Sequence, residues 1–364
     1  MRAPTASSTS SRIRWISAAS RRVTTRRSTG RGRSTRTSNS GGPMRLIDDS
    51  VDLTPYLREP EEGHKVRAAS EWAKDVIDVF YRPRTAPKVG LGFQKTWADF
   101  EIRPAEVTLW AGINGHGKSQ FVGHVTLNQC QQGQRVCVAS LEMAPKRSMA
   151  RMSRQAWGGN EPSMDFIRNF HAWTDGRLWL YDHVGNSNPE TMVAIIRYAA
   201  DKFGIQQFVV DNLTKVVDGE DNYNAQKDFV NRLCTVAHDT GVHVHLVAHV
   251  RKSKSEKEQP GKFDVKGAGS ITDLVDNVFI VWRNKAKEEA VRSGDMKYDL
   301  SEPDTILQLE KQRNGETEGH YGFWFDPASL QYLEARGDVP QRYKVELPKA
   351  ERPRSETVDI EGAF

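Results

Sequence analysis

The stretch Gly112-Ile113-Asn114-Gly115-His116-Gly117-Lys118-Ser119 fits the phosphate-binding loop pattern G-x-x-x-x-G-K-[ST] at every fixed position. Glycines allow successive backbone N–H groups to turn toward one centre and form an anion cradle. The lysine can then reach the outer phosphates of a nucleotide, and the serine hydroxyl can bind Mg²⁺. The loop therefore predicts a site for ATP, or another NTP, together with Mg²⁺.

The residues on either side place this loop between a strand and a helix. Residues 106–111 are typical of a buried strand, and residues 119–131 are typical of a helix whose N-terminus faces the phosphates. The alternative is a glycine-rich turn that arose by chance, and the flanking strand and helix favour the phosphate loop. The predicted nucleotide ligands are Gly112, Asn114, Gly115, His116, Gly117, Lys118, Ser119 and Gln120.

The charge of the chain is unevenly distributed along its 364 residues. Residues 1–47 contain eleven arginines and no lysine or acid, so a net charge of +5 leaves −6 for residues 48–364. Any basic surface for nucleic acid must therefore be local. Cys130, Cys137 and Cys234 lack the spacing of metal ligands and lie in apolar runs, which predicts reduced core thiols of an intracellular protein. No apolar run is long enough to span a bilayer.

Residues 1–43 are a basic, low-complexity extension that cannot bury enough apolar surface to fold alone, and we expect them to be disordered. Three interpretations remain open: an organelle transit peptide, a basic arm that touches nucleic acid, or an extension upstream of a true start at Met44. The abrupt change of composition at Met44 favours the last, and with it a cytoplasmic protein of a bacterial or phage-infected cell. Residues 336–364 are expected to form a disordered tail.

Residues 44–90 contain one helical pattern, between Glu61 and Tyr81. Its apolar side chains recur every three or four residues and give a single stripe. This linker helix precedes the nucleotide domain and lies outside its alternation of strands and helices. It either packs on its own domain or docks on the next subunit of a ring.

After the loop, strands alternate with helices. Strands are predicted at 135–141, 178–182, 207–211, 242–248, 277–282, 305–311 and 322–325, and helices at 149–157, 189–203 and 226–240. Such alternation predicts an α/β fold with a mostly parallel sheet and active residues at the carboxyl ends of the strands. The last strands predict a C-terminal β-hairpin.

Three polar residues follow predicted strands and complete the site. Asp211 ends an apolar strand, where it would hold Mg²⁺ together with Ser119. Glu142 follows the neighbouring strand, where a carboxylate can orient the attacking water or accept its proton. His249 ends a later strand and could contact the terminal phosphate. Each also has a plainer interpretation, as a turn Asp, a solvated Glu or a histidine satisfied by backbone groups.

Six blocks in this order resemble hexameric replicative DNA helicases of the DnaB and Twinkle type, nearest the phage-like branch: GINGHGKS, ASLEM, FVVDN, HVHLVAHVRK, KGAGSITDLVDNVFIVWR and KQRNGE. The resemblance covers about residues 91–333. It implies a RecA-like P-loop NTPase core over residues 91–335 that works as a homo-oligomeric, hexameric ring. Such a ring moves along single-stranded DNA by hydrolysing NTP.

The resemblance also implies roles for individual residues. Lys118 and Ser119 match nucleotide ligands, Glu142 the catalytic base, Asp211 the Mg²⁺ acid and His249 the phosphate sensor. Lys311 and Arg313 match a basic pair that enters the active site of the next subunit. From the sequence alone, Arg313 lies at a hairpin tip and can project outward, or it is a solvated turn arginine.

Residues 251–269 correspond to a central loop that grips DNA in the family. The predicted DNA ligands there are Arg251, Lys252, Lys254, Lys262 and Lys266. Lysine and arginine side chains that contact the phosphate backbone bind DNA without regard to its base sequence. The alternative is an ordinary solvated loop, because acids at 256, 258 and 264 dilute its charge.

The stretch between Met44 and the core is too short for a primase domain, and zinc-ligand cysteines are missing. We therefore expect a helicase that lacks a primase domain and works with a separate primase and loader. The competing hypotheses are a RecA-like DNA-binding ATPase for recombination or regulation, and an ATP-dependent loading factor.

Overall fold

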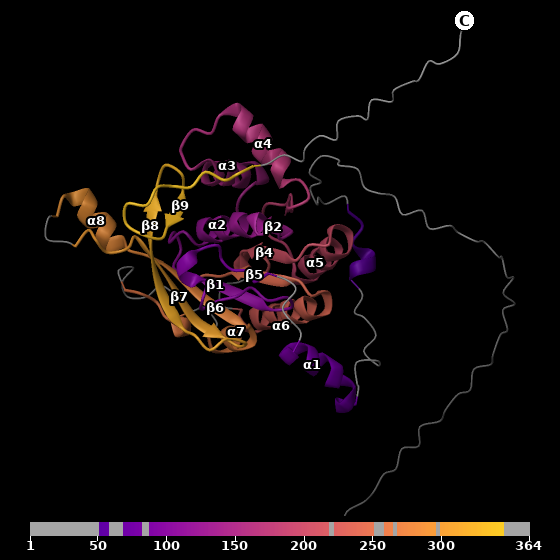
Figure 1. Cartoon of the computed structure of the whole chain (residues 1–364). Coiled ribbons are helices and arrows are strands. Elements are labelled where there is room, and N and C mark those ends of the chain that lie inside the picture. The colour runs from indigo at the N-terminus through magenta and orange to yellow at the C-terminus, as the bar shows by residue number, and fades with distance from the viewer. Residues whose placement is uncertain are drawn as a thin grey trace, which may run out of the picture. The chain divides into compact units, whose positions relative to one another are not determined.

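The computed structural model describes residues 51–57, 68–81, 87–217, 222–250, 258–264, 268–295 and 299–345. Within these residues, nine strands form one sheet in the order β3-β2-β4-β5-β1-β6-β7-β8-β9 (Figure 1). The predictions for residues 1–43 lie outside the described part of the chain.

Six of the strands are parallel and carry the predicted site at their carboxyl ends. They are β1 (Val107–Ala111), β2 (Val136–Ser140), β3 (Leu178–Leu180), β4 (Gln207–Asp211), β5 (His243–Val247) and β6 (Asn277–Arg283). Three antiparallel strands extend the sheet beyond β6, namely β7 (Thr305–Gln312), β8 (Gly319–Asp326) and β9 (Gln331–Leu333). The predicted mostly parallel sheet with a C-terminal hairpin is confirmed.

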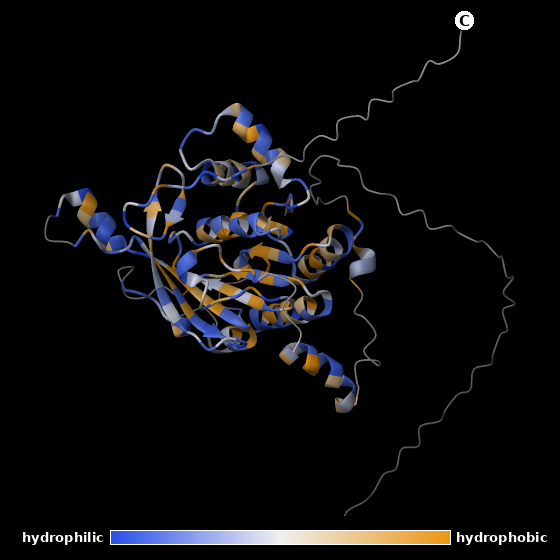
Figure 2. Ribbon diagram, in the orientation of Figure 1, coloured by the Kyte–Doolittle hydropathy of each residue, from blue (hydrophilic) through white to orange (hydrophobic). Residues whose placement is uncertain are grey.

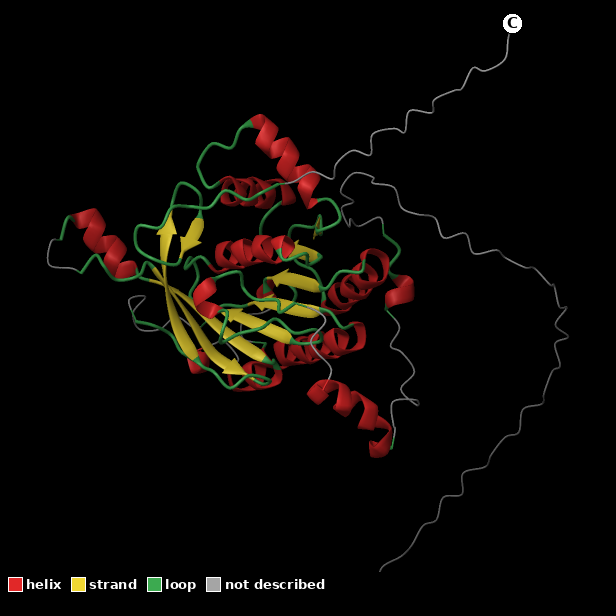
Figure 3. Cartoon of the chain, viewed as in Figure 1, coloured by secondary structure: helices red, strands yellow, loops and turns green. Residues whose placement is uncertain are grey.

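Helices cover both faces of this sheet (Figure 3). One face packs against α2 (Lys118–Gln131), α3 (Pro145–Trp157) and α4 (Met164–Thr174). The other packs against α5 (Pro189–Phe203), α6 (Tyr223–Thr240) and α7 (Ala268–Leu274). Hydrophobic residues concentrate along the central strands (Figure 2). Because both faces are buried, strands β1, β2, β4 and β5 consist of buried residues only, as parallel strands do.

Several elements begin or end where local signals predict. Pro189 occupies the first turn of α5 behind the Asn188 cap, and Gly241 ends α6 in a left-handed conformation. Helix α3 begins at Pro145 rather than at the predicted residue 149, because this proline starts the helix four residues earlier. Helix α4, helix α8 (Lys285–Ser293) and strand β9 were not predicted.

Helix α1 (Ala73–Tyr81) follows the short 3-10 turn Ala69–Trp72 and is shorter than the predicted helix at 61–81. Residues 58–67, which include the first part of that prediction, lie outside the described residues. The apolar stripe is exposed: Val76 is 50% exposed, Ile77 56% and Phe80 76%. These side chains therefore do not pack on the core of their own domain.

The packed part of the chain extends to residue 345, past the predicted boundary at 335. Tyr343 is buried, its hydroxyl donates to Asn128 of α2, and its backbone N–H donates to the carbonyl of Ala156. The guanidinium of Arg342 lies 3.9 Å from the ring centroid of Trp157. These contacts hold the segment after β9 against α2 and α3.

The three cysteines are free thiols, as predicted. Cys130 and Cys137 are buried in the core, whereas Cys234 on α6 is only partly buried. Among the described residues, no helix has the length and apolar character needed to cross a membrane.

Candidate active site

The phosphate-binding loop connects β1 to α2, as the sequence predicts. At the start of α2, Gly117 has φ +85°, and a Cβ there would lie 2.7 Å from the hydroxyl of Tyr332. A Cβ on Gly112 would lie 2.4 Å from the carbonyl oxygen of Val281 on β6. Both positions require glycine, because a side chain would collide with a neighbouring strand.

Lys118 is buried at the first turn of α2 and folds back onto its own loop. Its ammonium donates to the carbonyls of Gly112, at 2.9 Å, and Ile113, at 3.0 Å. It also lies 3.0 Å from Nδ1 of His249. Burial lowers the pKa of Lys118 to about 8, partly offset by the carboxylates of Asp211 and Glu142. A nucleotide phosphate would offer this cation a stronger partner than the loop carbonyls.

Ser119 and Asp211 lie together, as the Mg²⁺ prediction requires. The serine hydroxyl donates to Oδ1 of Asp211 at 3.0 Å. Asp211 ends β4 and is 6% exposed, and this burial raises the pKa of its carboxyl to about 6. A hydroxyl and a buried carboxylate supply hard oxygen ligands, and a bound divalent cation would neutralise the buried charge. The residues present therefore fit Mg²⁺.

Glu142 and His249 approach each other across the ends of β2, β4 and β5. The register pairs Ser140 with Asp211 and Asp211 with Val247, so the residues that follow these strands are neighbours. Oε1 of Glu142 accepts a hydrogen bond from Nδ2 of Asn212 at 2.6 Å. The same nitrogen lies 3.1 Å from Nε2 of His249. The two predicted catalytic side chains are therefore joined by one amide.

The remaining loop residues lie at different depths. His116 is buried, and its Nδ1 accepts from the backbone N–H of Arg283 at 3.1 Å, while burial lowers its pKa to about 4. Asn114 and Gly115 are exposed at the mouth of the loop. Gln120 turns away toward the carbonyl of Leu330, at 3.4 Å.

Lys311 and Arg313 lie toward the opposite end of the strands from their own phosphate loop. Gln312 pairs with Asn277 and Asn277 pairs with Thr108, so Arg313 is level with the start of β1. The loop follows the end of β1, and a five-residue strand is roughly 16 Å long. Neither side chain can therefore serve the loop of its own subunit in this conformation.

In this subunit both cations hold the end of α7. The ammonium of Lys311 donates to the carbonyls of Thr272, Asp273 and Val275, at 2.8 to 3.0 Å. The guanidinium of Arg313 donates to the carbonyl of Leu274 at 3.0 Å and pairs with Asp276 at 3.0 Å. Its side chain is half exposed. It thus lies on its own domain and does not project from the hairpin as expected.

Of the predicted DNA ligands, only Lys262 lies within the described residues. Its ammonium lies 3.7 Å from the carboxylate of Glu318 and 3.3 Å from the carbonyl of Glu310, which ties it to the β7–β8 hairpin. Arg251, Lys252, Lys254 and Lys266 lie outside the described residues.

His243 and His245 face the layer opposite to their apolar neighbours, as predicted, and they contact core groups there. Nε2 of His243 lies 2.8 Å from the hydroxyl of Thr108, and Nδ1 of His245 accepts from the indole of Trp110 at 3.1 Å. Burial lowers the pKa of both imidazoles, so they are neutral core groups.

Sequence reasoning missed three residues around the loop. Asn212 joins the two predicted catalytic side chains, and Tyr332 donates to the carbonyl of Gly117 at 3.3 Å. Arg151 of α3 is close enough for its charge to interact with Asp211. Asn212 directly follows the predicted Mg²⁺ acid, which is a usable signal. The other two come close only because β9 and α3 fold beside α2.

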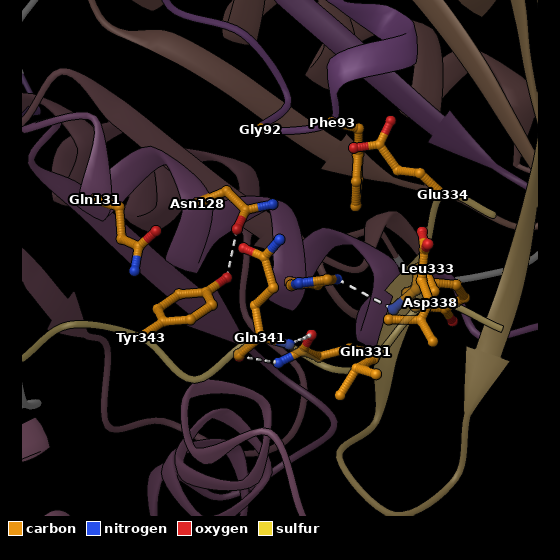
Figure 4. A pocket seen from close by; sticks show the side chains of 13 residues that line it. Gly92, Phe93, Asn128, Gln131, Gln331, Leu333, Glu334, Asp338, Gln341 and Tyr343 are labelled. Carbon is orange, nitrogen blue, oxygen red and sulfur yellow. Dashed lines mark hydrogen bonds between the residues drawn. The ribbon is translucent and has the colours of Figure 1, made fainter.

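A cavity of about 400 Å³ lies beside α2, and its lining includes none of the residues 112–119 of the phosphate loop. Figure 4 shows the side chains that line it. It is enclosed by Phe93, Asn128, Gln331, Glu334 and Tyr343. The backbone N–H groups of Gln94 and Lys95 already donate to the carboxylate of Glu334. The described lining supplies neither a phosphate cradle nor a metal ligand set.

Comparison with known proteins agrees with this geometry. The family of the DnaB-like helicase C-terminal domain matches residues 100–333. A DNA helicase/primase of Enterobacteria phage T3 is 24% identical over 268 residues, which are 65% of this chain and 45% of that protein. The chain thus spans less than half the length of this relative.

Two solved structures share the fold. One is the structure of a DnaB-like replicative helicase and its interactions with primase. Its TM-score is 0.59 and its sequence identity 15%, and the match covers 74% of this chain and 68% of that one. The other is an ATPase domain, with a TM-score of 0.58 and 15% identity over 73% of this chain and 98% of that one. At this identity the likeness shows the fold alone.

Proposed function

Because this chain belongs to the DnaB-like helicase C-terminal domain family, we propose that it is an NTP-driven DNA helicase that moves along single-stranded DNA and unwinds duplex during replication. One observation carries the proposal. The phosphate loop, the buried Asp211 and the joined pair of Glu142 and His249 converge at one edge of the sheet. We further propose that it acts in the cytoplasm of a bacterial or phage-infected cell, with a primase and a loader as partners.

The residues divide the chemistry between them. The loop amides and Lys118 bind the phosphates, and Ser119 and Asp211 hold the Mg²⁺ that neutralises charge on the outer phosphates. Glu142 lies within one amide of His249 and orients the attacking water as general base. His249 contacts the terminal phosphate, because its Nδ1 already faces the ammonium of Lys118.

Lys311 and Arg313 act in the site of a neighbouring subunit. Their distance from their own loop supports this assignment, since the length of β1 separates them from it. To reach a neighbour, Arg313 must exchange its contacts with Leu274 and Asp276 for contacts with a phosphate. These partners are two neutral carbonyls, of Asp273 and Leu274, and one carboxylate, and the guanidinium itself is half exposed. A phosphate offers a guanidinium more oxygens than these partners do.

Helix α1 is the element that joins neighbours into a ring. Its exposed stripe fits an apolar groove of about 620 Å³ between α3 and α4, lined by Met149, Ala150, Ile167 and Leu180. Acids on α1 match the cationic Lys146 at the groove. We propose that the occupant of this groove is α1 of a second copy. Accordingly, Ile77→Asp should dissociate the oligomer in sedimentation analysis. The control variant Val291→Asp changes an exposed residue of α8 and should not.

Single-stranded DNA is proposed to run along the segment 251–266 of each subunit. Lys262 supports this path, because this cation of the segment is partly exposed and contacts the hairpin that carries Arg313. Contacts with the phosphate backbone would give binding without sequence preference.

Strand separation on a forked DNA duplex tests the proposed function. The wild-type chain with ATP and Mg²⁺ should release the displaced strand, and Lys118→Ala should not. A wild-type protein that hydrolyses ATP on single-stranded DNA but never separates strands would contradict helicase activity. It would favour a DNA-binding ATPase instead.

A further inference from the structure

Asn212 lies between three elements of the site. It follows Asp211 at the end of β4 and is 1% exposed. Its Nδ2 donates to Oε1 of Glu142 at 2.6 Å and lies 3.1 Å from Nε2 of His249. Its Oδ1 accepts from the hydroxyl of Thr214 at 2.7 Å. Both ends of the amide are therefore engaged.

The partners fix which way this amide faces. A carboxylate can only accept hydrogen bonds, so the group that faces Glu142 must be the NH₂ end. The hydroxyl of Thr214 can donate to the oxygen at the other end. The reversed amide would place two oxygen acceptors 2.6 Å apart, which is repulsive.

This orientation selects one form of the His249 ring. Because the NH₂ of Asn212 only donates, its hydrogen bond to a neutral His249 requires Nε2 to accept and the ring proton to reside on Nδ1. Nδ1 lies 3.0 Å from the ammonium of Lys118, which also only donates. A neutral imidazole has one acceptor nitrogen and cannot satisfy both donors. While Lys118 lies against the ring, the two donors therefore compete for one acceptor, and one of the two contacts is unfavourable.

We propose that Asn212 is a positioning residue for hydrolysis, which holds His249 with its Nδ1–H toward the phosphate loop and holds the Glu142 carboxylate on the same amide. This inference rests on the proposed function. A nucleotide draws Lys118 toward its phosphates, and a phosphate oxygen then replaces the ammonium as the partner of Nδ1–H. The conflict at His249 is thereby relieved only while a phosphate occupies the site.

A purely structural role for Asn212 makes different predictions. An asparagine that only stabilised the turn after β4 would affect folding and nucleotide binding together. A positioning residue affects turnover through Glu142 and His249, and leaves nucleotide affinity nearly unchanged. The two roles separate when kcat, nucleotide Kd and melting temperature are measured on the same variants.

The experiment compares Asn212→Ala and the near-isosteric Asn212→Asp, which cannot donate, in the full chain. Each should lower kcat by ~10²-fold or more, the scale of one preorganised donor, with nucleotide Kd within about threefold of wild type. Thr214→Val should lower kcat less, and Thr214→Ser should restore it. Asn188→Ala is the matched control: it removes the cap of α5 and should lower the melting temperature without changing kcat.

A double-mutant cycle with His249→Ala completes the test. If Asn212 acts through His249, the loss from Asn212→Ala should be much smaller in the His249→Ala background than in wild type. If the kcat losses of the two single variants simply multiply in the double variant, Asn212 does not act through His249. That result, or an Asn212→Ala variant with near-normal kcat, would overturn this inference alone. A wild-type chain without NTP hydrolysis would overturn the proposed function and this inference with it.

Discussion

Replacing Asp211 by asparagine should stabilise the nucleotide-free protein while abolishing its response to Mg²⁺-nucleotide. Burial raises the pKa of this carboxyl from 3.8 to about 6, so the folded state holds the proton more tightly than the unfolded state. Stability is therefore lost as pH rises from about 4 to about 6. The difference of about two pKa units corresponds to a cost of ~3 kcal/mol for the ionised carboxylate above that range. Asparagine has the same shape, can still accept from Ser119 and carries no charge.

Urea denaturation at several pH values in the presence of a chelator measures this effect. The advantage of Asp211→Asn over wild type should be ~1 kcal/mol at about pH 4.5 and ~3 kcal/mol at about pH 7.5. Mg²⁺-nucleotide should then stabilise the wild type and leave the variant unchanged. A variant that is equally stable at every pH, or less stable near neutrality, would contradict this explanation. It would mean that neighbouring cations stabilise the carboxylate more than burial destabilises it.

Three further outcomes follow from the site. Glu142→Gln should retain nucleotide binding by calorimetry and lose turnover by ~10²–10³-fold, and loss of binding instead would make this residue structural. Gly117→Ala should weaken nucleotide binding, because the backbone φ of +85° is unfavourable for alanine and the new Cβ meets the Tyr332 hydroxyl. Adding Tyr332→Phe to this variant should restore binding only in part. Unchanged binding in Gly117→Ala alone would contradict the loop geometry. Alanine should replace three lysines of the DNA segment, namely Lys252, Lys254 and Lys266. The slope of log K against log[salt] for binding of single-stranded DNA, measured by fluorescence anisotropy, should then become less steep by about 2. An unchanged slope would mean that DNA binds elsewhere on the protein.

Local sequence patterns were enough to predict most of the strands and helices. The loop, strand β4 and helix α5 were predicted residue for residue, because glycine spacing, a strand-ending acid, a cap and a helix-starting proline act within a few residues. Helix α8 was missed although Asn284 caps it and Gly294 ends it, since its charged sequence lacks an apolar stripe. Strand β9 is three residues long and depends on pairing with β8.

The site was predictable only in part. Glu142, Asp211 and His249 could be chosen because each follows or ends a strand, and parallel strands end at one edge. The role of Asn212 requires the order β2-β4-β5, which places the ends of three strands side by side and which sequence periodicity does not contain. The contacts of Arg313 with the end of α7 likewise arise from tertiary packing and could not be read from a hairpin pattern.

ATP hydrolysis in mixed rings tests the proposed shared active site most directly. In the proposed ring, each site combines Lys118 of one subunit with Arg313 of the next, and such trans-acting arginines are worth ~10³–10⁵ in rate. Lys118→Ala and Arg313→Ala proteins should each be nearly inactive alone. Mixing them creates interfaces with both residues intact, so ATPase activity should partly recover. If activity does not recover although labelled subunits demonstrably exchange, Arg313 does not act across the interface, and the ring model is contradicted.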